Sequence, residues 1–342
     1  MSLTQLQPLP ATSSAFTLGD VLDALKAAGE ETRLRILLLL SEGELTVTDL
    51  TRVLGQSQPR VSRHIKILLD AGLIERHREG SWIILRLAAA SGLRQIIQGA
   101  LESLAPDLPE RRHDRAQLDV IKQERHEKAQ AFFAREASNW NMLRSRHVDV
   151  AQVEAMICEF TGDALYEQIV DLGTGTGRII ELLGDRATRA IGFDVNADML
   201  AYARVQLDRP EFHHCQVRQG DLFQLPQFAG SSDLVVLHQV LHVLSDPGAA
   251  VKEAARLLQP GGRALIVDFA PHSLEELRER ESHARLGISN PQMKRWLREA
   301  GLNLLRHADL PPDTSDAGQN LTVSLWLAER AVVTPLRAKQ RQ

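Results

Sequence analysis

A glycine-rich loop and an acidic residue form the part of this sequence best suited to hold a small ligand. Asp171 stands two residues before Gly173, and Gly175 and Gly177 follow at alternate positions after a predicted strand. Glycines let the backbone approach a ligand, and the N-terminus of the helix that follows favours a carboxylate or phosphate. A dinucleotide site would place its third glycine one residue later, where Arg178 stands.

Two further acids follow the next two predicted strands. Asp194 ends the second strand, where a carboxylate can accept hydrogen bonds from both hydroxyls of a ribose. Asp221, followed by Leu222, comes after the third strand and can accept from an adenine amino group. Since open α/β sheets bind ligands at the carboxyl ends of their strands, the three acids predict one site for an adenosine-like ligand.

A second region carries the opposite charge. Between Arg52 and Arg86 there are seven basic and three acidic residues, a local balance of about +4, whereas the whole chain carries −4. On a helix over 57–71, the apolar residues Val61, Ile65 and Leu68 would face a core. The opposite face and a following hairpin would carry the candidate DNA-binding residues, which are Ser57, Gln58, Arg60, Arg63, Lys66, Arg76 and Arg78.

The elements around this region predict a winged helix-turn-helix. Two helices over 17–40 break near Gly29, and a short helix follows with Thr46 as its N-cap and Gly55 as its end. After the helix over 57–71, two strands join at Glu79-Gly80, and another amphipathic helix covers 91–104. In this arrangement the second helix of the motif enters the major groove of DNA.

The second half of the chain alternates strands with helices. This alternation predicts a parallel α/β sheet with helices on both faces and a final antiparallel hairpin. The predicted strands are 168–172, 190–194, 212–216, 234–238, 263–269, 302–306 and 321–327. The expected organisation is a disordered tail (1–15), an α+β winged helix domain (16–104), a helical linker and lid (105–147), a Rossmann-like domain (148–330) and a C-terminal tail (331–342).

Composition narrows the class of protein further. The 342 residues suffice for two domains, and no run approaches the ~20 apolar residues of a membrane span. The first residues lack the basic and apolar blocks of a signal peptide, so we expect a cytoplasmic protein. The two cysteines, Cys158 and Cys215, form no CxxC pair, and we expect no metal site.

The stretch ELTVTDLTRVLGQSQPRVSRHIKILLDAGLIERHREGSWIILRL resembles the ArsR-type repressors of bacteria, over about residues 18–104. The resemblance implies a homodimer, with the helices near 18–30 and 91–104 at its interface, and binding to a palindromic, double-stranded operator. Many members sense metals or metalloids through a cysteine pair in the helix before the recognition helix. The matching segment here, Leu45-Thr46-Val47-Thr48-Asp49, has threonines at those places.

Residues 130–330 resemble the class I S-adenosylmethionine methyltransferases, especially those acting on small molecules. The loop VDLGTGTG and the stretches SSDLVVLHQVLHVLSDP and LLQPGGRALIVDF carry the likeness. The resemblance implies that Asp171, Gly173 and Gly175 hold the methionine end of S-adenosylmethionine or S-adenosylhomocysteine. By the same resemblance Asp194 holds the ribose, Asp221 and Leu222 hold the adenine, and Trp140 belongs to a helical lid.

Histidines near the expected methyl group are candidates for catalysis. His238, Gln239 and His242 follow the fourth strand, Asp268 and His272 follow the fifth, and His283 lies farther on. Neutral imidazole can accept a proton near pH 7, and our catalytic candidates are His238, His242 and His272, with His238 also a cofactor contact. The alternative is that each histidine only packs or solvates the pocket wall.

Some methyl acceptors are disfavoured by missing residues. The segment after the fourth strand, His238-Gln239-Val240-Leu241, has neither the (Asp/Asn)-Pro-Pro-aromatic motif nor the Pro-Cys pair of DNA methyltransferases. Arsenic methylation uses several cysteines, and the two here lie outside the pocket motifs.

Three functional hypotheses remain open. In the first, the C-terminal domain senses S-adenosylmethionine or S-adenosylhomocysteine and changes the DNA affinity of a repressor. In the second, it is an active small-molecule methyltransferase whose winged helix controls its own or neighbouring genes. In the third, the winged helix only dimerises a methyltransferase, against which the outward Arg60, Arg63 and Lys66 argue.

Overall fold

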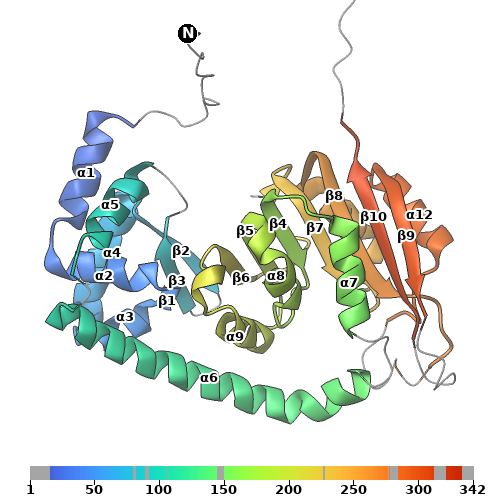
Figure 1. Cartoon of the computed structure of the whole chain (residues 1–342), viewed down its shortest axis with the longest axis horizontal. Helices are drawn as coiled ribbons and strands as arrows, with labels where there is room; N and C mark the ends of the chain where they lie inside the picture. The colour runs from blue at the N-terminus through green and yellow to red at the C-terminus, as the bar shows by residue number, and fades with distance from the viewer. Residues whose placement is uncertain are drawn as a thin grey trace, which may run out of the picture. The chain divides into compact units, whose positions relative to one another are not determined.

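The computed structural model divides the chain into two compact units, residues 1–121 and 122–342, and each is described by itself (Figure 1). The described residues are 16–79, 82–88, 92–105, 107–144, 150–225, 228–275, 277, 284–311 and 321–332. The predicted tail over 1–15 and most of the predicted C-terminal tail lie outside them. Within the described residues no helix has the length and apolar character to cross a membrane.

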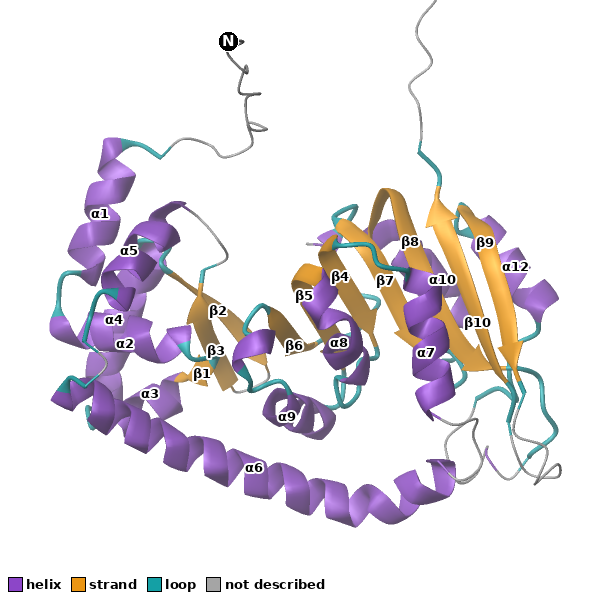
Figure 2. Cartoon of the chain, viewed as in Figure 1, coloured by secondary structure: helices purple, strands orange, loops and turns teal. Residues whose placement is uncertain are grey.

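The N-terminal unit has the predicted winged helix-turn-helix architecture. Its small antiparallel sheet has the order β1-β3-β2, and β2 and β3 form the wing (Figure 2). Its elements are α1 (Leu18–Ala28), α2 (Glu31–Ser41), β1 (Leu45–Thr46), α3 (Val47–Leu54), α4 (Gln58–Asp70), β2 (Ile74–Glu79), β3 (Trp82–Leu87) and α5 (Gly92–Glu102).

Local signals fix the helix-turn-helix. The N–H of Asp49 donates to Oγ1 of Thr46 at 3.1 Å, and the N–H of Thr46 donates to Oδ2 of Asp49 at 2.7 Å, which is a capping box at the start of α3. Gly55 ends α3 in the left-handed conformation, at φ +61°. Ser57 occupies the N-cap position of α4 as predicted, but its side chain makes no capping hydrogen bond.

The N-terminal core includes the start of a long connecting helix. Val61, Ile65 and Leu68 of α4 are buried, so the predicted apolar stripe faces the core. Leu118 and Ile121, from α6 (Pro109–Arg144), belong to the same cluster. The Pro- and charge-rich stretch at 105–115, predicted as a boundary, is therefore helical from Pro109 onward.

The C-terminal unit contains a seven-stranded sheet of order β6-β5-β4-β7-β8-β10-β9. Strands β6, β5, β4, β7 and β8 run parallel, and β10 is antiparallel to both of its neighbours. The strands are β4 (Tyr166–Leu172), β5 (Ala187–Asp194), β6 (Cys215–Gln219), β7 (Ser232–His238), β8 (Leu258–Phe269), β9 (Leu302–Leu310) and β10 (Val323–Arg330).

The predicted third strand, 212–216, is wrong in its position. Residues Pro210–Phe212 form a 3₁₀ turn, and β6 begins at Cys215. Proline starts this turn because its φ is already fixed near the helical value. Phe212 is buried beside the sheet, although it belongs to the turn. Since buried positions in turns and in strands both take apolar residues, the sequence pattern placed the strand too early.

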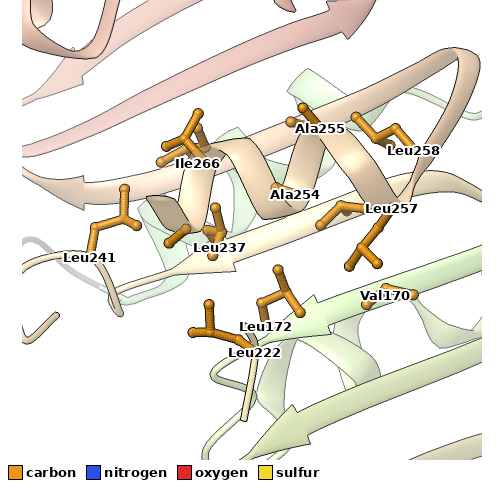
Figure 3. Packing of buried hydrophobic residues seen from close by; sticks show 14 of the residues in the cluster. Val170, Leu172, Leu222, Leu237, Leu241, Ala254, Ala255, Leu257, Leu258 and Ile266 are labelled. Carbon is orange, nitrogen blue, oxygen red and sulfur yellow. The ribbon is translucent and has the colours of Figure 1, made fainter. Parts of the chain in front are cut away.

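Alternate residues of the central strands face two separate cores. Ile169 and Leu234 pack with α7 (Val150–Thr161), α8 (Arg178–Leu183) and α9 (Ala197–Gln206). Val170 and Leu237 face the other side, where α10 (Pro247–Leu257) and α12 (Asn290–Glu299) pack, and Figure 3 shows α10 lying across these strands. The sheet is thus covered on both faces by helices.

Candidate functional site

The glycine-rich loop joins β4 to α8 in a conformation that glycine favours. Gly173, Gly175 and Gly177 have φ of +75°, +53° and +79°. A Cβ added at Gly173 would lie 2.5 Å from Cγ2 of Val240, so the loop packs tightly against the segment that follows β7. A Cβ at Gly175 would meet nothing within 4 Å. The loop is therefore closed toward the protein at Gly173 and open at Gly175.

Asp171 is a buried carboxylate without a hydrogen-bond partner. It is 0% exposed, and neither of its oxygens nor the hydroxyl of Thr174 meets a partner among the described residues. Burial raises the pKa of Asp171 to about 7, the nearby Thr174 hydroxyl opposes this rise, and the negative charge of Asp194 adds to it. Such an orphaned group is costly in the ligand-free protein and is suited to a cationic or hydrogen-bonding ligand.

Asp194 is held in place by the loop backbone. The N–H of Gly175 donates to Oδ2 of Asp194 at 2.8 Å, and the N–H of Asn196 donates to Oδ1 at 2.8 Å. Asp194 at the end of β5 pairs in register with Gln219 at the end of β6, so Asp194 and the segment that leads to Asp221 lie at neighbouring strand ends. The half-buried carboxylate is thus oriented before any ligand binds.

Asp221 and Leu222 lie just beyond β6. Asp221 is exposed and accepts from the N–H of Phe223 at 3.0 Å, while Leu222 is buried. Val195 and Phe223 are 67% and 42% exposed, and each directly follows or closely follows a predicted ligand-binding acid. Sequence reasoning missed these two apolar residues, although their position beside the acids was the available signal.

His242 and Asp268 form a buried pair. Nδ1 of His242 lies 2.8 Å from Oδ1 of Asp268, and the two side chains are 9% and 0% exposed. The same carboxylate accepts the N–H groups of Leu241 at 2.9 Å, His242 at 3.2 Å and Phe269 at 2.8 Å. Asp268, which the sequence offered as one candidate among several, therefore binds both the ring and the backbone of the segment after β7.

The three catalytic candidates gather at the ends of β7 and β8. The ring of Phe269 lies 4.9 Å from the His242 ring and 6.4 Å from the His272 ring, measured between centroids. His238 ends β7, and burial lowers its pKa to about 4, against the opposing charge of Asp268. His283 and the side chain of Trp140 lie outside the described residues.

The segment after β7 carries backbone strain. Gln239 has φ +51° and is the one non-glycine residue with positive φ among those described. Its N–H donates to the carbonyl of Val267 at 2.7 Å, which fixes the turn that leads into His242. Strained residues of this kind cluster at ligand sites, so the turn supports a functional reading of the strand ends.

The two cysteines lie in the core of the C-terminal unit. The part of the chain that is described contains no cluster of three or more histidine, cysteine or acidic residues suited to a metal ion. Cys158 and Cys215 are not bonded to each other, and both pack in the core that contains α7 and α8. Burial raises the pKa of the Cys215 thiol to about 12, which disfavours the thiolate that metals and arsenic require.

The N-terminal candidates lie on the outer face of α4 and on the wing. Arg60, Arg63 and Lys66 are exposed on α4, opposite its buried stripe, and Ser57 and Gln58 are exposed at its N-terminus. Arg76 and Arg78 are exposed on β2 of the wing. By contrast, His64 is half-buried on the inner side, with Nδ1 3.4 Å from Oε2 of Glu30 at the start of α2.

Comparison with known proteins assigns the two units separately. Residues 30–76 match the family model "Bacterial regulatory protein, arsR family", and residues 170–266 match "Methyltransferase domain". The arsenical resistance operon repressor of Escherichia coli K12 is 50% identical over 64 residues, which are 18% of this chain and 55% of that protein. An arsenic resistance transcriptional regulator of Pseudomonas putida is 37% identical over 89 residues, which are 24% of this chain and 70% of that protein.

The C-terminal unit has relatives of its own. An arsenite methyltransferase of Aquipseudomonas alcaligenes is 34% identical over 139 residues, 36% of this chain and 40% of that protein. Across the E. coli repressor and this enzyme, the chain spans about half the length of the relatives it matches. A solved S-adenosylmethionine-dependent methyltransferase of Mesorhizobium loti is 17% identical, with a TM-score of 0.45, over 52% of this chain and 96% of that one.

The fold and these matches define a two-domain chain, a winged helix-turn-helix joined to a Rossmann-like class I methyltransferase domain. The chain belongs to the bacterial arsR family of regulatory proteins through its N-terminal unit.

Proposed function

We propose that this protein is an operator-binding transcriptional regulator whose methyltransferase domain binds S-adenosylmethionine or S-adenosylhomocysteine and thereby changes its affinity for DNA. The observation that carries the proposal is the acidic site beside the glycine loop, where one carboxyl group lacks hydrogen-bond partners and another is already oriented. Asp171 is fully buried without a partner, and Asp194 is already oriented by the N–H of Gly175. An adenosyl ligand would supply the donors that these groups lack.

The acids present fit an adenosyl ligand along its whole length. The ammonium group of the methionine end would pair with Asp171, directly or through water, and the open space at Gly175 would admit the ligand. The ribose hydroxyls would donate to Asp194. Asp221 would accept from the adenine amino group, while Leu222 and the exposed Val195 and Phe223 would contact the flat ring.

The exposed face of α4 is the proposed reader of operator DNA. Arg60 and Arg63 can each donate two hydrogen bonds to a guanine, and Gln58 can pair with an adenine. Lys66, Ser57 and the wing residues Arg76 and Arg78 would contact phosphates or the minor groove. The cationic residues point away from the core, so they can bind DNA without a change of fold.

The segment where family members are expected to sense metals has a structural role in this chain. Thr46 and Asp49, which stand in the segment where relatives carry cysteines according to the resemblance, form the capping box of α3. Their oxygen atoms satisfy backbone N–H groups and stabilise the helix by about 1 kcal/mol. A regulator without thiols at this place requires another ligand site, and the methyltransferase domain offers one.

We also propose a homodimer, through α1 and α5. Leu18, Leu22 and Leu25 form a stripe along α1 and are 77%, 44% and 46% exposed. A stripe of this spacing on one face is typical of a helix that packs against a partner. A two-fold dimer would present two copies of α4 to a palindromic operator.

Helix α6 can connect the ligand to the DNA-binding unit. Arg35 of α2 donates two hydrogen bonds to Asp114 of α6, at 2.8 and 2.6 Å, and Asp114 is buried. Together with Leu118 in the core, this pair makes the first turns of α6 part of the N-terminal unit. A shift in the continuous helix would then reach α2 and its neighbour α4.

Fluorescence anisotropy with a labelled duplex from the protein's own promoter tests the proposal. We expect the dissociation constant for DNA to change between about 5- and 150-fold on saturation with S-adenosylhomocysteine or S-adenosylmethionine. Asp194→Ala should bind DNA as the wild type does but show no response to either ligand. Equal DNA affinity of the wild type with and without both ligands would refute sensing.

Small-molecule methyl transfer is a second candidate, favoured by the histidines gathered beside the glycine loop. The end of β7, which carries His238, lies next to the end of β4, which carries the glycine loop. Turnover of S-adenosylmethionine with cell extract, measured as S-adenosylhomocysteine released, tests this candidate. No release above a buffer blank would count against it.

A further inference from the structure

We infer that His242 is a general base held by Asp268, and that the methyl acceptor of this domain is a molecule with an ionisable O–H or N–H group. The inference rests on the second candidate function and on the adenosyl ligand proposed above. It names a catalytic residue, a positioning residue and a substrate class, each of which can be tested without knowing the natural acceptor.

The backbone hydrogen bonds around Asp268 all use its carboxylate as an acceptor. Its oxygens accept three backbone N–H groups, from Leu241, His242 and Phe269, in addition to the contact with the His242 ring. Each of these backbone N–H groups can only donate, so the Asp268 carboxylate acts as the acceptor in all three bonds. An ionised carboxylate only accepts hydrogen bonds, so the ring nitrogen facing it must be the donor.

This requirement selects one tautomer of His242. With the proton on Nδ1, directed at Asp268, the lone pair of neutral His242 is on Nε2. A carboxylate partner also stabilises the imidazolium that forms when Nε2 takes up a proton. In His272, another candidate, Nδ1 accepts the backbone N–H of Leu274 at 3.3 Å.

The position of His242 matches the place where a base is needed. The segment 239–242 leaves the carboxyl end of β7, next to β4, whose end carries the glycine loop. Val240, two residues before His242, is the side chain that a Cβ at Gly173 would strike. The base therefore stands on the segment that packs against the loop proposed to hold the methionine end.

A base narrows the class of acceptor. Carboxylates are ionised near pH 7, and an arsenite thiolate complex attacks through a lone pair that carries no proton, so neither requires one. A phenolic hydroxyl or an ammonium group, with pKa about 10, is protonated near pH 7 and must lose its proton. The pair of His242 and Asp268 is therefore useful only to acceptors that must lose a proton.

The proposed step balances in atoms and charge. When bound, S-adenosylmethionine supplies an electrophilic methyl group. The acceptor oxygen or nitrogen forms a bond to the methyl carbon, the carbon–sulfur bond breaks with both electrons remaining on sulfur, and Nε2 of His242 takes the acceptor proton. Asp268 keeps its charge, and His242 later releases the proton to water.

Nitrogen NMR of the full chain, labelled with ¹⁵N and saturated with S-adenosylhomocysteine, tests the dyad without turnover. Long-range ¹H–¹⁵N spectra, with His242 assigned by its loss in His242→Asn, should show a protonated Nδ1 and an unprotonated Nε2 near neutral pH. In Asp268→Asn the amide oxygen would keep the N–H groups of Leu241 and His242, and the NH₂ would face Nδ1 with loss of the hydrogen bond from Phe269, so the tautomer should invert. A proton on Nε2 in the wild type would overturn the inference.

A transfer assay tests the catalytic role. With labelled S-adenosylmethionine, we expect methylation of catechol or phenethylamine and none of benzoate or of arsenite with glutathione. His242→Asn, which keeps a donor to Asp268, should lose at least about 100-fold in rate, a typical general-base contribution, while its affinity for S-adenosylhomocysteine changes less than about 3-fold. The exposed His213→Asn is the matched control and should keep the wild-type rate.

The possible failures are distinguishable. Transfer to benzoate or arsenite, a rate that His242→Asn leaves unchanged, or no transfer to either proton-bearing acceptor would each overturn the base and its substrate class. These results would leave adenosyl binding intact. Absence of heat on titration of wild-type protein with S-adenosylhomocysteine would instead refute the ligand proposal itself.

Discussion

The recognition helix and the glycine-loop site hold charge in opposite ways. On α4 the charges of Arg60, Arg63 and Lys66 lie on exposed side chains that make no contribution to the buried stripe. In the C-terminal domain the carboxyl group of Asp171 is fully buried, and Asp194 is fixed by backbone N–H groups. The first site consists of side chains on the surface of a helix, whereas the second depends on the backbone conformation of the loop itself.

This difference predicts how each site responds to change. Substitution on the outer face of α4 should alter DNA affinity and leave the free energy of unfolding nearly unchanged. Substitution in the glycine loop should alter both ligand affinity and stability, because the same backbone forms the site and packs against Val240.

Gly173→Ala should abolish measurable binding of S-adenosylhomocysteine. The new Cβ would lie 2.5 Å from Cγ2 of Val240 at a φ of +75°, so both the loop and its neighbour must move. Gly175→Ala, at φ +53° with nothing within 4 Å, carries the strain without the clash and should cost about 1–2 kcal/mol. Calorimetry and thermal unfolding measure the pair. Equal effects of the two substitutions would show that the contact with Val240 is unimportant.

Asp194→Asn should weaken S-adenosylhomocysteine binding by about 100-fold. The amide has one acceptor oxygen in place of two, so it cannot serve the N–H groups of Gly175 and Asn196 and also both ribose hydroxyls. Lost hydrogen bonds to a charged group are worth about 1.5–3 kcal/mol each. Asp198→Asn, on the exposed first turn of α9, is the control for charge alone. A similar loss in both variants would contradict a direct role for Asp194.

Arg63→Ala should weaken operator binding by about 1–3 kcal/mol and relax the preference for one base. Arg76→Ala, on the wing, should weaken binding to all duplexes alike. It should also reduce the slope of log affinity against log salt concentration by about 1. Anisotropy at several salt concentrations separates the two effects. Both variants should bind S-adenosylhomocysteine as the wild type does. A loss of ligand affinity in either variant would contradict the claim that the two sites use different residues.

The pKa of Asp171, about 7, predicts pH effects of known sign. If the ligand ammonium binds the ionised carboxylate, affinity should rise about tenfold from pH 6 to pH 8. Without ligand, the folded protein holds a proton that the unfolded chain has already lost above pH 4. The stability contributed by this group is therefore complete below about pH 4 and is lost as pH rises through about 7. Asp171→Asn should flatten both profiles, and unchanged profiles would contradict this assignment.

Local signals in the sequence predicted much of the fold. The capping box of Thr46 and Asp49 and the left-handed Gly55 lie within a few residues of the helix ends they fix. The position of β6 could not be predicted, because the apolar Phe212 looks the same in a strand and in a buried 3₁₀ turn. A buried position takes an apolar residue in either kind of structure, so the residue type does not distinguish them.

The candidate site was only partly accessible to the same reasoning. Asp171, Asp194 and Asp221 could be proposed because each follows a strand directly in the sequence. His242 and Asp268 could be named as candidates but not as a pair, since 26 residues separate them and only the pairing of β7 with β8 brings them together. The strain at Gln239 likewise has no signal in the residue type.

Calorimetric titration of S-adenosylhomocysteine into the protein, free and saturated with operator duplex, tests the central claim most directly. Thermodynamic linkage requires the two sites to affect each other by the same factor. We predict that bound DNA changes the ligand dissociation constant by the factor that the ligand changes DNA affinity, about 5- to 150-fold. Identical ligand affinity in the free and DNA-bound protein would contradict the account.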